Sequence, residues 1–440
     1  MRIHDFIGIG VGPFNLGLAA LTAPITELDG LFLDRAERFE WHPGMMLETA
    51  HLQVPFMADL VTMADPTSPY SFLNYLKSAG RLYPFYIREN FYPLRTEYSR
   101  YCAWVAGQLP NVRFGSDVVS VDYDDGARLY RLTVTEGGAQ VQYLTRRLVL
   151  GTGTSPTVPA HCAALEEQPG SGVVHSGRYL ERKAQLQTLE SITVVGSGQS
   201  AAEIYYDLLQ DMDAHGYRLD WVTRSPRFFP LEYTKLTLEL TSPEYVDYFH
   251  ALPADQRETL GKVQKQLYKG INADLINEIY DLLYLRSVES QPRTSLYTNV
   301  ALENVTPGKS GYELALTHVE QGHAFTLDTA GLVLANGYSY REPAFLAGIG
   351  SRIARLPDGK FDVSRDYSVT PGEIFVQNAE LHTHGFSAPD LGMGAYRNSV
   401  IIREMLGWEY YPIEERIAFQ HFGAPVRASD APQTPIGAAL

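Results

Sequence analysis

The sequence predicts an α/β fold made of two Rossmann-like sheets with a small helical region attached. Two glycine-rich turns, each between a strand pattern and a helix pattern, lie about 190 residues apart in the 440-residue chain, at Gly10 and at Gly196. Each is followed by a second strand, which is the β-turn-α-β order of a doubly wound parallel sheet. A chain with two such turns is expected to hold two dinucleotides, which suggests a flavin reduced by a nicotinamide.

Length and composition indicate a multidomain globular enzyme. A chain of 440 residues exceeds one ordinary core, so two or three domains are expected. The formal charge of −15 argues against nucleic acid or an anionic membrane as the main partner, because these need clustered Lys and Arg. Without a signal-peptide pattern or a long apolar run, we expect a cytoplasmic protein with no membrane span. Cys102 and Cys162 lack Cys-x-x-Cys spacing and are expected to be buried apolar residues.

The first β-turn-α-β unit accounts for the start of the chain. Residues 5–10 are a short apolar strand, 16–21 open a helix, and 28–34 are a second strand that ends on an acid. A long aromatic stretch punctuated by prolines occupies 36–110. Two segments then alternate like antiparallel strands, 112–134 and 140–150.

The second unit has the same order over 192–223, with a helix at 200–212. A polar, helix-rich stretch at 232–290 follows it, and strand patterns resume at 298–334. The chain then returns to a strand at 373–376 and a final helix, so the second dinucleotide domain is expected to be inserted into the first. The expected domains are 1–160 with 340–425, 161–231 with 291–339, a mainly helical substrate region at 232–290, and a disordered tail at 426–440.

The first glycine-rich turn has the residues that a pyrophosphate needs. Gly10 and Gly12 allow a tight bend and close backbone approach, and a helix starting near Pro13 offers free N–H groups and a positive dipole end. Asn15 replaces the usual third glycine. Asp34 ends the next strand, where an acid accepts a ribose hydroxyl. A plain structural turn is the alternative, which this strand-and-helix context disfavours.

The second turn differs at the end of its following strand. Its loop, Gly196-Ser197-Gly198-Gln199-Ser200, has Ala201 at the third-glycine position. Arg224 stands where an NAD site would carry an acid, and a guanidinium suits a 2′-phosphate. Ser225 and Arg227 could add donors, whereas a solvated surface arginine is the alternative. The sequence therefore favours NADPH over NADH.

Other chemistries find little support in the sequence. Trp41 and His42 follow the first unit, where an isoalloxazine would lie, although His42 could equally be a hydrogen-bonded loop residue. No His-Glu-x-x-His, His-x-Asp or Cys cluster is present, so no metal is expected. The segment Gly196-Ser-Gly lacks the Gly-x-Ser-x-Gly nucleophile elbow of hydrolases.

Several motifs over nearly the whole chain resemble one family. These are Phe6-Ile-Gly-Ile-Gly-Val-Gly-Pro-Phe-Asn15-Leu, Trp41-His-Pro-Gly-Met45, His51-Leu-Gln-Val-Pro-Phe56, Asp59-Leu60, Pro66-Thr-Ser-Pro-Tyr-Ser-Phe-Leu-Asn-Tyr75-Leu and His382-Thr-His-Gly385. They are similar to the flavin-dependent N-hydroxylating monooxygenases of siderophore biosynthesis, which act on lysine, ornithine or diamines. The resemblance implies FAD at the first turn, NADPH at the second, O₂ as co-substrate, and an amine pocket between them.

The resemblance also implies roles for single residues. Gln53 resembles the family glutamine beside the flavin, Arg95 the arginine near the reduced flavin and nicotinamide, and Asn272 an asparagine facing nicotinamide ribose and substrate. A helix N-cap is the alternative for Asn272. Gln199 and Ser200 resemble the NADPH pyrophosphate loop. The remaining cofactor candidates are Ser197, Asn336 and Leu391.

The chain departs from the amino-acid hydroxylases at Ala58. Ornithine and lysine enzymes carry a lysine there that neutralises the substrate carboxylate, and a buried carboxylate without a partner costs several kcal/mol. Leu238 similarly aligns with a second asparagine of ornithine enzymes. Both changes favour a diamine, putrescine or cadaverine, and Asp390 is the candidate to hold its distal ammonium, unless it is a loop cap. Weaker candidates are Glu239 and Glu244.

The implied mechanism places the hard chemistry on the cofactor. NADPH reduces FAD, and the reduced flavin captures O₂ as a C4a-hydroperoxide that hydroxylates an unprotonated amine. The free amine has a pKa of about 10.4, so a pocket poor in carboxylates around the reacting nitrogen should lower it. The competing classes are a lysine or ornithine hydroxylase, a disulfide or quinone reductase, a Baeyer–Villiger or sulfur-oxidising monooxygenase, and a flavin-binding sensor. A homodimer or homotetramer is expected by resemblance alone.

Overall fold

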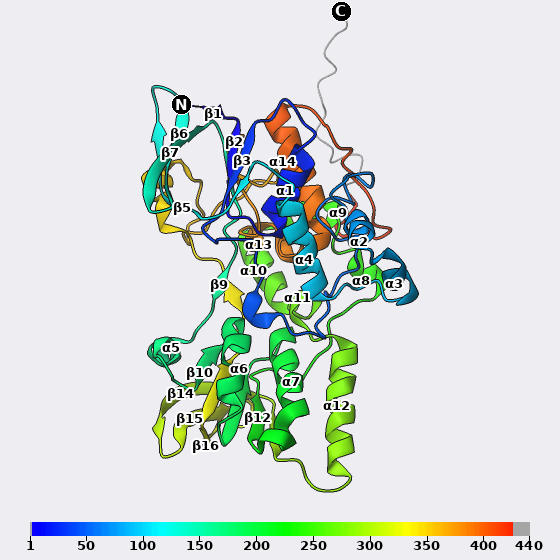
Figure 1. The fold of residues 1–440 in the computed structure, drawn as a ribbon, viewed down its shortest axis with the longest axis vertical. Coiled ribbons are helices and arrows are strands. Elements are labelled where there is room, and N and C mark those ends of the chain that lie inside the picture. Colours follow the sequence, from blue (N-terminus) through cyan, green and yellow to red (C-terminus); the bar gives the residue numbers. More distant parts are fainter. Residues whose placement is uncertain (1, 426–440) are drawn as a thin grey trace, which may run out of the picture.

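The computed structural model describes residues 2–425 and confirms the predicted α/β fold. One main sheet lies in the upper part of Figure 1 and includes β2 (Phe6–Ile9) and β3 (Gly30–Leu33). The other lies in the lower part and includes β10 (Val173–His175) and β12 (Arg218–Val222). The tail expected at 426–440 lies outside the described residues. In the part of the chain that the structure describes, no helix is both long and apolar enough to cross a membrane.

The upper sheet has six strands in the order β19-β20-β8-β2-β3-β4, all parallel except β19. Its central strands are short runs in which every residue is buried, as expected where both faces of a parallel sheet are covered. The strands are β2 (Phe6–Ile9), β3 (Gly30–Leu33), β4 (Val112–Arg113), β8 (Leu148–Leu150), β19 (Ser368–Thr370) and β20 (Ile374–Val376).

Helices cover one face of this sheet and an antiparallel meander covers the other. The predicted antiparallel segments are therefore only partly right, since their ends, β4 and β8, join the parallel sheet instead. The covering elements are α1 (Pro13–Thr22), α4 (Arg95–Ala106) and α14 (Gly394–Leu406) on the helical face, with β5 (Ser116–Asp124), β6 (Leu129–Glu136), β7 (Ala139–Thr145) and η3 (Ala344–Arg352) on the other.

Two glycines make room for aromatic rings in the sheet. A Cβ on Gly8 would collide with the ring of Phe32, and one on Gly30 would collide with the ring of Phe6. The two phenylalanines pack edge to face, with ring centroids 5.4 Å apart. The glycines are therefore required by packing, although glycine in a strand is otherwise unfavourable.

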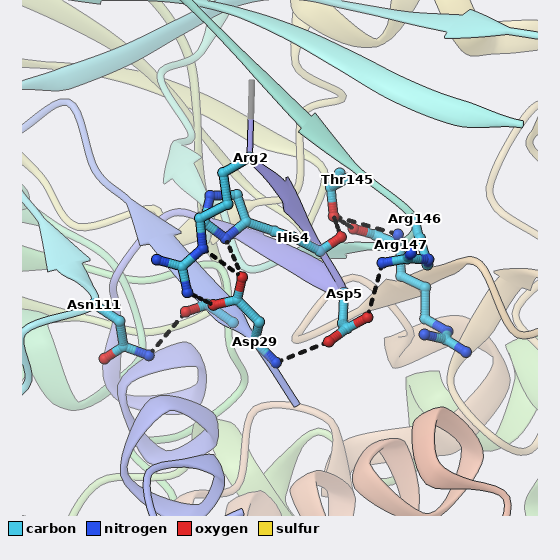
Figure 2. Close-up of polar contacts among 9 residues, drawn as sticks. Arg2, His4, Asp5, Asp29, Asn111, Thr145, Arg146 and Arg147 are labelled. Carbon is cyan, nitrogen blue, oxygen red and sulfur yellow. Dashed lines mark hydrogen bonds and ion pairs between the residues drawn. The ribbon is translucent and has the colours of Figure 1, made fainter. Parts of the chain in front are cut away.

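A polar cluster closes the edge of the sheet where β2 and β3 begin (Figure 2). Arg2 Nε donates to Asp29 Oδ2 at 2.8 Å, and Asp29 in turn donates its backbone N–H to Asp5 at 3.0 Å. Arg146, which follows β7, donates to the same Asp5 carboxylate at 3.0 Å. This edge lies at the strand ends opposite the glycine-rich turn, so the polar cluster supports the sheet and is remote from the cofactor turn.

The lower sheet has five parallel strands in the order β10-β17-β11-β12-β13. Helices α6 and α7 pack on one face, and a three-stranded antiparallel sheet packs on the other. The elements are β10 (Val173–His175), α6 (Tyr179–Leu186), β11 (Ser191–Val195), α7 (Gln199–His215), β12 (Arg218–Val222), β13 (Thr294–Tyr297), β14 (Val300–Gly308), β15 (Gly311–His318), β16 (His323–Thr329) and β17 (Gly331–Leu334).

The helix-rich stretch predicted at 232–290 contains five helices. The last of them packs along α7, so this part of the stretch shares the core of the lower sheet (Figure 1). Of the others, α9 (Pro243–Ala251) and α10 (Ala254–Val263) lie against helix α13 (Leu381–His384) and the turn after it in the upper half, and Tyr268 of α11 (Gln266–Lys269) stacks on Phe386 of that turn. The first and last helices of the stretch are α8 (Lys235–Leu238) and α12 (Ala273–Ser287).

Two extended segments cross between the halves and pair with each other, β9 (Ser155–Pro156) and β18 (Tyr338–Ser339). Close to them, Gly44 of η1 (Pro43–Met45) packs so tightly on Gly177 of η2 (Ser176–Arg178) that any Cβ at Gly44 would collide with the Gly177 carbonyl. The remaining elements are β1 (Ile3–His4), α2 (Phe72–Ser78), α3 (Leu82–Ile87), α5 (Ala160–Glu167), η4 (Gly385–Ser387) and η5 (Leu391–Met393).

Candidate active site

The first glycine-rich turn is shaped as an anion cradle. Gly10 has a φ of +87° and lies so close to Gly151 that a Cβ would be 2.5 Å from its carbonyl oxygen. Gly12 is the N-cap of α1, and a Cβ there would meet nothing within 4 Å. No side chain caps this helix, and Pro13 starts it. The turn thus presents open space above uncapped N–H groups, which fits a pyrophosphate.

Asn15 is buried against the turn, and its cofactor role stays a prediction. Its side chain is buried, and Nδ2 donates to the Gly10 carbonyl at 2.7 Å. Its Oδ1 accepts from Gln377, which follows β20, at 2.7 Å. Asn15 therefore holds the turn in shape from below, a task that the usual glycine could not perform.

Asp34 lies where the ribose-binding acid was predicted, directly after β3. One carboxylate oxygen accepts from the Val11 N–H of the turn at 2.6 Å, and the other accepts from Ala36 at 2.8 Å. The carboxylate is thus fixed beside the cradle. Leu391 also lies here, lining a small cavity with Pro13, and the roles of both residues toward a cofactor stay predictions.

The second glycine-rich turn repeats this design. Gly198 is the N-cap of α7 without a side-chain cap, and the nearest atom to a Cβ there would be the Lys269 carbonyl oxygen at 3.5 Å. The Gly196 carbonyl is fixed by the indole N–H of Trp221 at 2.8 Å. Ser197 and Ser200 flank this open turn, half-buried. A pyrophosphate fits here for the same reasons as at the first turn.

Arg224 follows β12, at the edge of the sheet where α7 begins. It is exposed, and within residues 2–425 it makes no hydrogen bond or ion pair with another side chain. Its neighbour Ser225 instead donates to the Arg227 carbonyl at 2.8 Å, so the predicted Ser225 donor is used inside the loop. Asn336 is exposed after β17, and its cofactor role stays a prediction.

Gln53, Gln199 and Asn272 meet at the second turn. Gln199 Oε1 accepts from Gln53 Nε2 at 2.9 Å and from the Asn272 backbone N–H at 2.7 Å. The Asn272 side chain caps α12 by accepting from the Leu275 N–H at 3.1 Å, which is the alternative noted from the sequence. The three residues nevertheless lie together, from parts of the chain far apart in sequence.

A buried ion pair extends this network, and sequence reasoning missed half of it. Glu203 accepts from Gln199 Nε2 at 2.8 Å and pairs with Arg95 at 2.8 Å. Burial raises the pKa of Glu203, whereas the Arg95 charge and the Gln199 bond lower it. The available signal was an acid four residues after Gln199, which places both on one face of α7.

Aromatic residues line the junction near Arg95. His42 has a left-handed φ of 50°, and its ring packs on Trp41 and Tyr338 with centroids 5.4 Å away in each case. Burial lowers the pKa of His42, and the Arg95 charge lowers it further. Trp41 in turn packs on Tyr98 at 5.3 Å. A neutral His42 between Trp41 and Tyr338 therefore joins residues of both halves.

Ala58 and Asp390 both lie beside Gly392. A Cβ on Gly392 would be 3.9 Å from Ala58 Cβ and 3.0 Å from Asp390 Oδ1. Asp390 caps η5 by accepting from the Gly392 N–H at 2.6 Å, so it is a loop cap as well as a half-buried acid. Burial raises the pKa of its carboxyl group. The Asp390 charge also reaches Tyr233, where it adds to the rise in the phenol's pKa caused mainly by burial.

Three further residues were considered for substrate binding, Leu238, Glu239 and Glu244. Leu238 is 46% exposed on α8, and its substrate role stays a prediction. Glu239 and Glu244 were weaker candidates for the ammonium. In the structure their carboxylates accept backbone N–H groups from residues 417–420.

Two glycine-rich turns, each shaped for a pyrophosphate at the start of a helix, define a protein of the two-dinucleotide oxidoreductase class. Comparison of the sequence with models of known protein families identifies one family. The family model described as L-lysine 6-monooxygenase/L-ornithine 5-monooxygenase matches residues 2–340, and the chain belongs to this family. The resemblance read from the sequence motifs is thereby confirmed.

Individual relatives are similar over nearly their full length. The chain is 53% identical to a putrescine N-hydroxylase of Shewanella oneidensis, over 99% of this chain and 87% of that protein. A crystal structure of the desferrioxamine-pathway cadaverine monooxygenase of Erwinia amylovora, bound to FAD, is 55% identical with a TM-score of 0.95, over 97% and 100% of the two chains. An ornithine N-hydroxylase of Kutzneria with reduced FAD, NADP⁺ and L-ornithine is 26% identical with a TM-score of 0.84, over 92% and 99%.

Proposed function

We propose that this protein is an FAD- and NADPH-dependent monooxygenase that N-hydroxylates an aliphatic diamine, putrescine or cadaverine, for a hydroxamate siderophore. The similarity to a putrescine N-hydroxylase and to a cadaverine monooxygenase supports the diamine. The FAD of the Erwinia structure and the NADP⁺ of the Kutzneria structure support the two cofactors.

The observation that carries the diamine proposal is that an uncharged residue, Ala58, and an acid, Asp390, both lie beside Gly392. A lysine at position 58 would neutralise the charge of a substrate carboxylate, but alanine offers no charge. Asp390 instead provides a carboxylate, whose Oδ1 lies 3.0 Å from the position that a Cβ added to Gly392 would occupy. A pocket with this acid and no cation at position 58 suits an ammonium and disfavours a buried α-carboxylate.

The two glycine-rich turns fit the cofactors. Open space at Gly12 and Gly198, above uncapped helix starts, suits two pyrophosphates, and the exposed Arg224 suits a 2′-phosphate. When bound, the flavin reduced by the nicotinamide supplies the activation of O₂. The domain assignment, FAD on the upper sheet and NADPH on the lower, follows from these turns and belongs to the proposal.

The chain's own residues perform the remaining tasks. Asp390 holds the distal nitrogen as an ammonium, because its charge favours the protonated form. The reacting nitrogen must be neutral, and near Gln53 the Glu203 carboxylate is already paired with Arg95. Its negative charge is therefore largely compensated and does little to keep the amine protonated. Trp41, His42 and Tyr338 pack side by side and help to exclude water.

The test is a substrate comparison with purified protein. We expect a yellow protein that consumes NADPH in preference to NADH and forms hydroxylamine with putrescine or cadaverine. Ornithine and lysine should give much less hydroxylamine. A preference for either amino acid would overturn the diamine proposal, and a colourless protein that binds no flavin would overturn the function as a whole.

A homodimer or homotetramer is also part of the proposal. Helix α12 carries a stripe of exposed apolar residues at helical spacing, which is unusual for a fully solvated helix and suits an interface. The stripe consists of Tyr280, Tyr284 and Leu285 and continues to Val288, the residue directly after the helix, and each is between 65% and 70% exposed. Light scattering after gel filtration should give a mass above that of one chain, and a monomer would contradict this part.

A further inference from the structure

After α14 the chain continues without helix or strand over residues 407–425, which we call the C-terminal strap. Glu244 of α9 fixes its middle, since Oε1 accepts from the backbone N–H of Ile417 at 2.7 Å and of Ala418 at 2.9 Å. Carboxylates that accept several backbone N–H groups form strong, charge-assisted bonds. One glutamate thus holds two consecutive peptide groups of the strap.

Glu239, directly after α8, holds the next two peptide groups. Its two oxygens accept from the backbone N–H of Phe419 at 3.0 Å and of Gln420 at 3.1 Å. The Gln420 side chain adds a further hydrogen bond, which it donates to the Leu236 carbonyl at 2.6 Å. Four consecutive N–H groups of the strap are therefore bound by two glutamates of the helical region.

Apolar burial contributes little to this part of the strap. Ile417 is 53% exposed and Phe419 is 89% exposed. Ala418 is buried but small. Because hydrophobic stabilisation scales with buried apolar area, the carboxylate contacts carry most of the attachment here.

The segment that the strap contacts also borders the candidate amine site. Just before α8, the Tyr233 hydroxyl donates to the Gln53 carbonyl, and its pKa responds to the Asp390 charge. Tyr245 of α9 packs on Phe386 of the upper half at 5.7 Å and on Phe422 of the strap at 5.1 Å. The strap thus contacts residues 236–245, which follow closely on Tyr233, the residue bonded to Gln53.

We propose that Glu239 and Glu244 are positioning residues for amine binding, which fasten the C-terminal strap to residues 231–245 and so fix the wall of the amine site. The inference rests on the proposed function for the identity of the amine. Neither glutamate touches the substrate, so their effect passes through the strap and Tyr233. Loss of both should loosen the wall without changing either glycine-rich turn.

The test compares the double variant Glu239→Ala/Glu244→Ala with Glu244→Gln and with Glu303→Ala. Glutamine keeps Oε1, which accepts both N–H groups at position 244, but removes the charge that strengthens them, so Glu244→Gln should raise KM for the amine much less than the alanine pair does. Glu303 is exposed on β14, in the lower half, and is the matched control. For the alanine pair we expect KM for the amine to rise about tenfold, as for loss of several hydrogen bonds that order a site, while kcat and KM for NADPH change less than about twofold.

A second measurement separates positioning from general destabilisation. Hydrogen exchange of residues 231–245 should be faster in the alanine pair, while exchange in α1 and α7 stays as in the wild type. An unchanged amine KM in a flavin-loaded alanine pair would overturn the inference, and so would a uniform loss of all kinetic parameters. If the wild type prefers ornithine or lysine, the proposed function fails, but the same KM comparison with that amine still decides the role of the strap.

Discussion

Arg95 of α4 donates to Glu203 of α7 at 2.8 Å, joining helices of the two halves across 108 positions of sequence. Both side chains are largely buried, at 17% and 5% exposure. Removing one partner of such a pair leaves the other charge buried and uncompensated. The resulting loss of stability exceeds the net stability that the intact pair contributes. This contact therefore fixes the orientation of α7, and with it the second glycine-rich turn, toward the residues near Gln53.

Replacing Glu203 with Gln should disturb the site more than the fold. Glutamine keeps the acceptor for Gln199 or Arg95 but removes the negative charge, so Arg95 should become mobile. We expect flavin reduction by NADPH to slow by about tenfold or more, with a smaller change in FAD content. Stopped-flow measurement of flavin reduction tests this, with Glu289→Gln on the surface as the control. Equal rates in Glu203→Gln and wild type would show that the pair has no role in the site.

Gly12→Val should separate cofactor binding from folding. A Cβ at Gly12 meets nothing within 4 Å, and the residue's φ of −85° suits any amino acid. We therefore expect the variant to fold with wild-type circular dichroism but to lose most of its bound FAD, because the side chain fills the pyrophosphate space. In contrast, Gly44→Ala should impair folding itself, since its Cβ collides with Gly177. Full flavin content in Gly12→Val would contradict the assignment of the first turn.

Arg224→Ala should reduce the preference for NADPH over NADH. Arg224 is exposed and lacks a side-chain partner within residues 2–425, so its loss should cost nothing in stability. A charge-assisted contact to a 2′-phosphate is worth about 1.5–3 kcal/mol, which corresponds to about 10- to 150-fold in kcat/KM for NADPH. The value for NADH should stay within about twofold. Arg100→Ala, on the exposed side of α4, should change neither value.

Ala58→Lys should weaken diamine turnover. The side chain at 58 is buried beside Gly392, so a lysine ammonium would lie near Asp390 and compete with the substrate's own ammonium. We expect kcat/KM for putrescine and cadaverine to fall by about 100-fold, mainly through KM. Ala58→Met, long but uncharged, distinguishes charge from bulk. If methionine and lysine lower the value equally, steric filling and not charge explains the loss.

Local signals predicted more of this molecule than long-range ones did. Both glycine-rich turns and the buried strands were predicted because their patterns lie within about 30 residues. The role of Asn15 could not be predicted, because its partner Gln377 is 362 positions away. The same holds for Glu239 and Glu244, whose partners lie more than 170 positions further along the chain. A polar side chain in a sequence shows what it can bind, but only the fold shows which group reaches it.

Stability should fall on mild acidification, and His384 allows a direct test. It is fully buried, stacked on Tyr367 at 4.6 Å, and burial holds its pKa well below the ordinary 6.5. Below pH 6.5 the unfolded chain binds a proton that folded His384 does not, so the free energy of unfolding falls by about 1.4 kcal/mol per pH unit for this group. Five further histidines have lowered pKa values and add in the same direction, His4, His42, His51, His175 and His382.

Urea unfolding at pH 7.5, 6.5 and 5.5 measures this slope. The buried carboxyl groups of Glu380 and Asp59 have raised pKa values and act with the opposite sign, but they are common to all variants. His384→Gln should therefore show a slope smaller than that of the wild type by about one proton, even if it is less stable throughout. His323→Gln, exposed on β16, should keep the wild-type slope. Identical slopes in wild type and His384→Gln would mean that His384 is protonated equally in the folded and unfolded chains.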